Sequence, residues 1–316
     1  MRIRTLFTLE TPYREPLELR AAEFGDENAD PCCAVVGSMR GNEVQQTFIC
    51  ARLVRRLADM ENRGMLDARR RVLVVPSVNA FSMNIGKRFW AVDNTDINRM
   101  FPGYDAGETT QRIADGLFRE VKDYAYGVQL ASYYLPGNFL PHVRVTDAGA
   151  VSAESMRMAD AFGFPYAVLK GPHSFDTAIL NFNWQIWGAH AFSVYTRETD
   201  RACRDEAEFA QDCILRFLHE VGAVRHGVVG GSITAHIDEE SLVNVRTRHA
   251  GGFFESKVAP GERVTAGTLL GEVLDSFDAT PREALVSPVN GRVFFTHTAS
   301  LINQYTIAFK IVPEIM

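Results

Sequence analysis

Two patterns of apolar and polar residues alternate along the first two thirds of the chain. Uninterrupted apolar runs rich in β-branched residues predict buried strands at 32–38, 71–78, 126–132, 165–170 and 190–196. Segments with apolar residues about every 3.6 positions predict helices at 44–64, 110–122 and 205–221. Such alternation is typical of an α/β fold, in which helices cover a mixed, mostly parallel sheet.

The pattern changes after residue 226. The segment GVVGGS at 227–232 is typical of a linker, and the short apolar runs beyond it alternate with Gly and Pro turns. We therefore predict an α/β domain over 1–226 and a small, barrel-like all-β domain over 227–316. The β pattern resembles the barrel halves of biotinyl and lipoyl carriers, but the predicted hairpin at 282–293 has no lysine at its turn. A carrier function is therefore not expected.

Composition narrows the class of protein. The 316 residues carry a formal net charge of −6 and are 46% apolar and 23% charged, as in an ordinary globular protein without a basic field for nucleic acid. No apolar stretch reaches the roughly 20 residues that a membrane span needs, and acids and prolines interrupt the first 19 residues too early for a signal peptide. The five cysteines form no CxxC pair, so neither a disulfide framework nor a cysteine metal site is expected. We expect a cytoplasmic protein without nucleic-acid or membrane partners.

A long connection interrupts the α/β pattern. The segment 76–108 has little apolar periodicity and is far longer than a usual loop, yet it mixes aromatic residues with charges of both signs. We interpret it as a wall of a binding site. Within it, Asn98 and Arg99 offer an amide and a bidentate fork suited to a carboxylate or an amide carbonyl. An equally good interpretation is that Arg99 forms an ion pair with Asp93 or Asp96 that stabilises the loop.

Four segments together resemble a known family. GSMRGNE (37–43), VNAFSMNIGKRFWAVDNTDINRMFPG (78–103), ETTQRIADGLF (108–118) and FSVYTRET (192–199) are similar, in order and spacing, to the succinylglutamate desuccinylase and aspartoacylase family of the zinc carboxypeptidase superfamily. The resemblance covers nearly the whole chain. It implies a zinc-carboxypeptidase-like three-layer α/β/α domain, a C-terminal β domain, and hydrolysis of the amide bond of N-acyl amino acids.

The same resemblance implies a zinc ion held by two histidines and one glutamate, with a second glutamate as general base. In this sequence only Glu43 matches a ligand position, because Arg40 and Ala131 stand where the histidines belong. Gln129 replaces the acid of the second motif. An arginine offers no lone pair to a metal, and alanine offers nothing. We therefore expect a degenerate metal site and no cofactor, with Arg40 paired to Glu43 and within reach of Glu198.

Other family positions are kept. By resemblance, Glu198 falls at the general base, and Arg88 with the Asn98–Arg99 pair falls at the positions that bind the substrate carboxylate and polarise its carbonyl. His142 lies in a segment, LPHVRV, that also resembles the family, and it is a candidate acid and base. Arg40 could act as a weak electrophile.

Further candidates favour structural roles. The only HxxE string, His236 to Glu239, lies past the linker, and we interpret it as a surface turn. His173 and His190 flank predicted strands and are expected to be hydrogen-bonded structural residues rather than ligands.

The aromatic and thiol side chains are weak candidates for catalytic or binding roles. We favour a core role for the aromatic run Phe182, Trp184 and Trp187. No GxSxG elbow occurs, and Cys32 and Cys33 begin a strand expected to be buried, so a nucleophilic mechanism is weakly supported.

Three functional hypotheses follow. The first is a divergent deacylase-family protein that binds a small carboxylate-bearing amide or amino-acid-like ligand at Arg88, Asn98 and Arg99 without canonical zinc. The second is an active metal-dependent amidohydrolase whose rebuilt ligand set includes Glu43, Glu198 and a histidine such as His142, with zinc as cofactor. The third is a non-catalytic binding or assembly protein. The sequence does not determine the oligomeric state, and a homo-oligomer is compatible with it.

Overall fold

The computed structural model describes residues 1–12, 15–148, 152–171 and 174–314. The chain divides into two compact units, one of Met1–Ser132 with His142–His236 and one of Tyr133–Pro141 with Ile237–Met316. The sequence suggested a single boundary after residue 226. The smaller unit instead takes in Tyr133–Pro141, because strand β6 (Gly137–Phe139) pairs antiparallel with β16 (Gly291–His297) of that unit.

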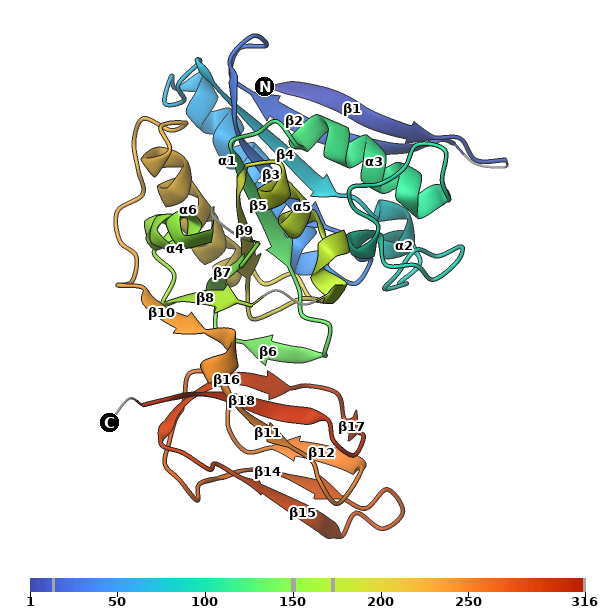
Figure 1. Cartoon of the computed structure of the whole chain (residues 1–316), viewed down its shortest axis with the longest axis vertical. Helices are drawn as coiled ribbons and strands as arrows, with labels where there is room; N and C mark the ends of the chain where they lie inside the picture. Colours follow the sequence, from blue (N-terminus) through green and yellow to red (C-terminus); the bar gives the residue numbers. More distant parts are fainter. Residues whose placement is uncertain (13–14, 149–151, 172–173, 315–316) are drawn as a thin grey trace. The chain divides into compact units, whose positions relative to one another are not determined.

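A nine-stranded mixed sheet forms the centre of the larger unit, with the strand order β1-β2-β4-β3-β5-β9-β7-β8-β10 (Figure 1). The strands are β1 (Arg2–Leu9), β2 (Leu17–Phe24), β3 (Asp30–Ser38), β4 (Arg70–Ser77), β5 (Tyr126–Ala131), β7 (His142–Thr146), β8 (Tyr166–Lys170), β9 (His190–Tyr195) and β10 (Ala235–Asp238). The central pairs β4–β3, β3–β5 and β5–β9 are parallel, whereas β7 runs antiparallel to β9. The predicted mixed, mostly parallel sheet is confirmed.

Helices pack on both faces of this sheet. The regular helices are α1 (Val44–Asn62), α2 (Ala80–Asn84), α3 (Thr109–Val121), α4 (Ser152–Met158), α5 (Leu180–Ile186) and α6 (Arg204–Glu220), and the short 3-10 helices are η1 (Ile97–Arg99), η2 (Ala159–Phe162), η3 (Ser174–Ala178) and η4 (Glu239–Ser241). Along β3, Cys33 and Val35 belong to the core under α1 and α6, while Ala34 and Val36 belong to the core under α3 and α5. This alternation is what a strand buried on both faces requires.

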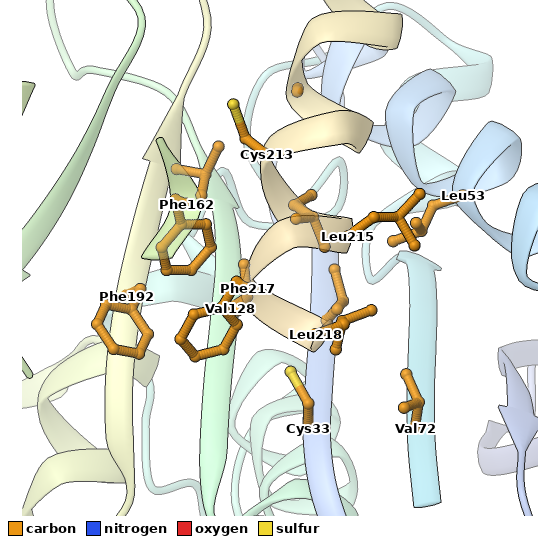
Figure 2. Close-up of a cluster of buried hydrophobic side chains, with 14 of the residues drawn as sticks. Cys33, Leu53, Val72, Val128, Phe162, Phe192, Cys213, Leu215, Phe217 and Leu218 are labelled. Carbon is orange, nitrogen blue, oxygen red and sulfur yellow. The ribbon is translucent and has the colours of Figure 1, made fainter. Parts of the chain in front are cut away.

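The first of these cores is rich in aromatic rings (Figure 2). Phe217 of α6 stacks on Phe162, with ring centroids 4.2 Å apart and an interplanar angle of 9°. Phe192 of β9 packs against both rings. These contacts hold α6 against β9, the strand that leads directly into the loop carrying Glu198.

The predicted strands and helices of the larger unit are observed within about two residues, but strands β7 and β10, helices α2 and α4 and the edge hairpin β1–β2 were not predicted. The strands of the hairpin alternate charged and apolar residues at the half-exposed edge of the sheet, so they lack the continuous apolar runs of the buried strands.

The aromatic run forms α5. Trp184 is fully buried, and its indole Nε1 donates to the carbonyl of Val121 at 2.9 Å, so its core role is confirmed. Trp187 is 51% exposed, so the core prediction is wrong for that residue. Trp187 lies just past the end of α5, and its ring covers the edge of Phe118.

The smaller unit contains two antiparallel sheets. Their strands are β11 (Val243–Arg246), β12 (Gly252–Ser256), β13 (Arg263–Val264), β14 (Leu269–Leu274), β15 (Pro281–Val286), β16, β17 (Leu301–Ile302) and β18 (Ile307–Pro313). One sheet has the order β11-β18-β16-β13, and the other has the order β15-β14-β12-β17. Leu270, Val273, Val293 and Phe309 are fully buried between them. The predicted all-β character is confirmed.

Two smaller expectations concern the whole chain. All five cysteines are free thiols, and all except Cys203 are buried. Within the described ranges, no helix has both the length and the apolar character that a membrane crossing requires.

Candidate functional site

The loop between β3 and α1 is held in a tight conformation by the glutamate that ends it. Glu43 Oε2 accepts hydrogen bonds from the backbone N–H groups of Met39 and Arg40, at 2.8 and 3.0 Å. Gly41 N donates to the carbonyl of Arg88 at 2.8 Å. A Cβ at Gly41 would lie 2.2 Å from the carbonyl oxygen of Lys87, so only glycine lets the two loops approach this closely.

Arg40 is the centre of a closed polar network. Its Nε and Nη2 donate to Asp96 Oδ2 at 3.2 and 2.9 Å. Its Nη1 lies 3.3 Å from Glu43 Oε1 and 3.3 Å from both the carbonyl oxygen and Oγ of Ser132. Ser132 Oγ in turn donates to Glu43 Oε1 at 2.5 Å. The predicted ion pair between Arg40 and Glu43 is therefore present, and Asp96 adds a second carboxylate.

The network is buried, and its two carboxylates both pair with the single guanidinium of Arg40. The side chains of Arg40, Glu43 and Asp96 are only 5%, 2% and 11% exposed. Burial alone would lower the pKa of the Arg40 guanidinium, but the negative charges of Glu43 and Asp96 outweigh burial and raise that pKa above its ordinary value. Arg40 is thus a permanent cation. Four of the five N–H hydrogens of this guanidinium are directed at protein acceptors.

The long 76–108 segment closes one side of this network. Asp96 Oδ1 accepts from Asn98 N at 3.1 Å, so the same carboxylate that pairs with Arg40 also begins the short helix η1. Asn98 is 8% exposed, and its Oδ1 accepts from Leu180 N at 3.1 Å. The amide nitrogen of Asn98 is therefore the group left to donate to a ligand.

The two arginines of the predicted carboxylate site lie on the same segment. Arg99 is half-buried, and its Nη1 donates to the carbonyl of Asn98 at 2.8 Å. Among these described residues no ion pair joins Arg99 to Asp93 or Asp96; Asp96 pairs with Arg40, and Asp93 accepts from Thr95 N. The backbone carbonyl of Arg88 accepts a hydrogen bond from Gly41 N, so the backbone of Arg88 lies beside the 39–43 loop. The guanidinium of Arg88 lies over the ring of Phe89.

Glu198 lies in the loop after β9. Its side chain is 19% exposed, and its Oε1 accepts from Arg201 Nη2 at 2.9 Å. The backbone N–H of Glu198 donates to Glu206, whose pKa is raised because burial disfavours the charged carboxylate. Gln45 N donates to the carbonyl of Thr199, which ties this loop to the start of α1. Although both ends are described, no hydrogen bond or ion pair joins Glu198 to Arg40 or Glu43.

His142 is placed in the same row of the sheet as Ala131. Tyr195 of β9 pairs with Ala131 of β5 on one side and with His142 of β7 on the other. The rings of His142 and Tyr195 stack with centroids 4.7 Å apart and an interplanar angle of 3°, and the guanidinium of Arg144 lies 4.6 Å from the Tyr195 centroid. His142 has no exposed surface. It packs within the sheet, and its acid-base role stays a prediction.

The remaining histidine candidates lie away from the network. His190 Nδ1 bonds Ser155 Oγ at 3.0 Å and its ring stacks on Tyr126, so its structural role is confirmed. His236 Nε2 bonds Asp160 Oδ1 at 2.6 Å and is exposed, but it lies in the edge strand β10, so the predicted surface turn is wrong for this residue. His173 falls outside the described residues.

Sequence reasoning missed two members of the network. Asp96 was considered only as a partner of Arg99, and Ser132 was not considered at all. Ser132 directly follows β5, and a polar residue at the carboxyl end of a buried parallel strand was the available signal.

The comparisons with known proteins agree with this fold. Residues 29–221 match the family described as the succinylglutamate desuccinylase/aspartoacylase catalytic domain. The chain belongs to this family. It is also 25% identical over 261 residues to the N-alpha-acetyl-L-2,4-diaminobutyric acid deacetylase of Halomonas elongata, a match that covers 78% of this chain and 71% of the relative.

Solved structures of the desuccinylase/aspartoacylase family share the fold of this chain. A succinylglutamate desuccinylase/aspartoacylase from Rhodobacter sphaeroides superposes with a TM-score of 0.78 and 21% identity, covering 94% of this chain and 89% of that one. The product-bound Ectoine utilization protein EutE (DoeB) from Ruegeria pomeroyi gives a TM-score of 0.78 at 18% identity, covering 96% and 92%.

The residues of this family member do not fit the zinc ion that the family implies. Within the described ranges, no three His, Cys, Asp or Glu side chains lie close enough to hold a metal. At the network, Glu43 already uses both carboxylate oxygens, and Arg40 places a fixed positive charge against it. Ala131 contributes only a methyl group beside Ser132. A cation-repelling guanidinium and a methyl group are not zinc ligands.

Proposed function

We propose that this protein is a divergent deacylase-family protein that binds a small carboxylate-bearing amide or an amino-acid-like ligand, and that an internal ion-pair network has replaced its zinc site. The single observation that carries the proposal is the position of Arg40. Its guanidinium is bonded to Glu43, the one matching ligand residue, and to Asp96. The cation of the site is thus supplied by the chain itself.

The proposed ligand class follows from the chemistry of the polar side chains on the 76–108 segment. Arg88 and Arg99 can bind a carboxylate through charge-assisted hydrogen bonds, and the amide nitrogen of Asn98 can donate to an acyl carbonyl. The Halomonas relative is named for an N-acetylated amino acid. N-acyl amino acids therefore combine the two groups that this side of the site can recognise.

A rebuilt metal site is less well supported. Glu43, Glu198 and His142 would have to converge, but Glu198 pairs with Arg201 and His142 stacks on Tyr195. These three residues, all within the described ranges, form no ligand cluster. The geometry therefore favours ligand binding without a canonical metal.

Binding can be tested by thermal unfolding with a panel of N-acetyl and N-succinyl amino acids. A ligand that binds only the folded state at about 100 times its Kd should stabilise the protein by about 2.7 kcal/mol. The stabilisation should shrink in Arg99→Met and persist in Arg119→Met, which alters an arginine exposed on α3. A panel without any stabilising ligand, or an undiminished shift in Arg99→Met, would refute the proposed pocket.

A further inference from the structure

We propose that Ser132 is a metal-independent nucleophile that accepts the acyl group of an N-acyl substrate. This inference rests on the proposed function, because it uses the same site and the same ligand class. It goes further because it assigns chemistry to Ser132, which stands at none of the ligand or base positions that the family resemblance implies. The juxtaposition that points to it is a serine hydroxyl between a buried carboxylate and a buried guanidinium.

The position of Ser132 suits a reacting group. It follows the last residue of β5, at the carboxyl end of a central parallel strand, where open α/β sheets place their ligands. Ser132 is partly exposed, whereas Arg40 and Glu43 behind it are buried. A substrate would therefore meet the hydroxyl before it meets either charge.

Glu43 is arranged as the base for this hydroxyl. Ser132 Oγ donates to Glu43 Oε1 at 2.5 Å, while the backbone N–H groups of Met39 and Arg40 hold Oε2. A nucleophile bonded to a base that a further group orients is the arrangement by which enzymes activate serine. The two backbone donors fix which oxygen of Glu43 faces Ser132.

Arg40 supplies the positive charge that this step needs. Its Nη1 lies 3.3 Å from Ser132 Oγ, and its Nε and Nη2 are anchored on Asp96. A fixed cation beside the hydroxyl lowers the free energy of the negative charge that develops on Oγ during attack, and it does so without reorganisation.

The reaction balances with water as the only co-reactant. Ser132 Oγ attacks the acyl carbonyl carbon, and its proton passes to Glu43. The C–N bond then breaks, and Glu43 returns the proton to the leaving amine, which leaves an acyl ester on Ser132. Water attacks this ester with Glu43 again taking a proton, the C–Oγ bond breaks, and Ser132 regains its proton while the carboxylic acid departs.

The test uses an alkyl fluorophosphonate, from which a serine nucleophile displaces fluoride to give a stable phosphonyl ester. In the full chain, peptide mass mapping should place the label on Ser132. The label should be absent from Ser132→Ala and unchanged in Ser241→Ala, whose hydroxyl donates to the carbonyl of Asp238 in the other unit. Glu43→Gln should slow labelling by about 100-fold, the range expected when a general base is lost.

Two results would overturn the inference. One is folded wild-type protein in which Ser132 is labelled no faster than Ser241. The other is labelling of Glu43→Gln at the wild-type rate. Because the wild-type measurement needs no variant, misfolding of Glu43→Gln would not obscure it. The probe carries no carboxylate, so its failure is distinct from failure of the proposed ligand pocket, which the N-acyl amino acid panel tests.

Discussion

Replacing Arg40 by methionine is expected to destabilise the protein by about 3–5 kcal/mol, the usual effect of removing one partner from a buried ion pair. The loss is large because Arg40 serves two carboxylates at once, and both Glu43 and Asp96 would keep their charges in a buried site. Methionine fills similar space, so the change reports mainly on charge. Urea unfolding monitored by circular dichroism measures the difference in the free energy of unfolding.

The matched control is Arg119→Met, which also removes an arginine that pairs with two aspartates. Arg119 is 60% exposed, so solvent screens its pairs with Asp105 and Asp115, and little change in stability is expected. Adding Glu43→Gln and Asp96→Asn to Arg40→Met should recover part of the lost stability, because the unpaired charges are then gone. Equal effects of Arg40→Met and Arg119→Met would contradict the claim that Arg40 stabilises the two buried carboxylates.

The second large effect is the creation of a zinc site. Arg40→His combined with Ala131→His would place two imidazoles near Glu43 and restore the ligand types that the family resemblance implies. The double variant should bind about one zinc ion, and free zinc at about 1,000 times its Kd should stabilise the folded state by about 4 kcal/mol. Titration calorimetry together with thermal unfolding in zinc measures both quantities.

The single variants Arg40→His and Ala131→His are the controls for the double variant. Each offers one imidazole and one carboxylate, which is too few ligands for a stable zinc site. A double variant that folds but binds zinc no better than either single variant would show that Ala131 is not the position of the missing histidine.

The fold could be predicted from the sequence because its central strands and main helices carry strong local signals. The run CCAVVGS is buried on both faces as β3, and the periodic apolar residues of 44–64 form α1. The hairpin β1–β2 and the three-residue strand β6 lack such signals. The hairpin joins the sheet only where β2 pairs with β4, and β6 adds to β16, so both depend on strands distant in sequence.

The site could be predicted only in part, for the same reason. Arg40 and Glu43 lie three residues apart, and their pairing was visible from spacing. Asp96 and Ser132 lie 56 and 92 positions from Arg40 in sequence, and only the folded sheet brings them together. The pattern DINR suggested a local partner for Asp96, but the longer-range pair with Arg40 is the one observed.

The central claim is that the guanidinium of Arg40 supplies the positive charge at the position where the family resemblance implies a zinc ion. The most direct measurement is elemental analysis by inductively coupled plasma mass spectrometry of full-length wild-type protein, expressed with added zinc and dialysed without chelator. The account predicts clearly less than one equivalent of zinc, and unchanged thermal stability after treatment with a chelator. A full equivalent of zinc that is lost in Glu43→Gln would contradict it.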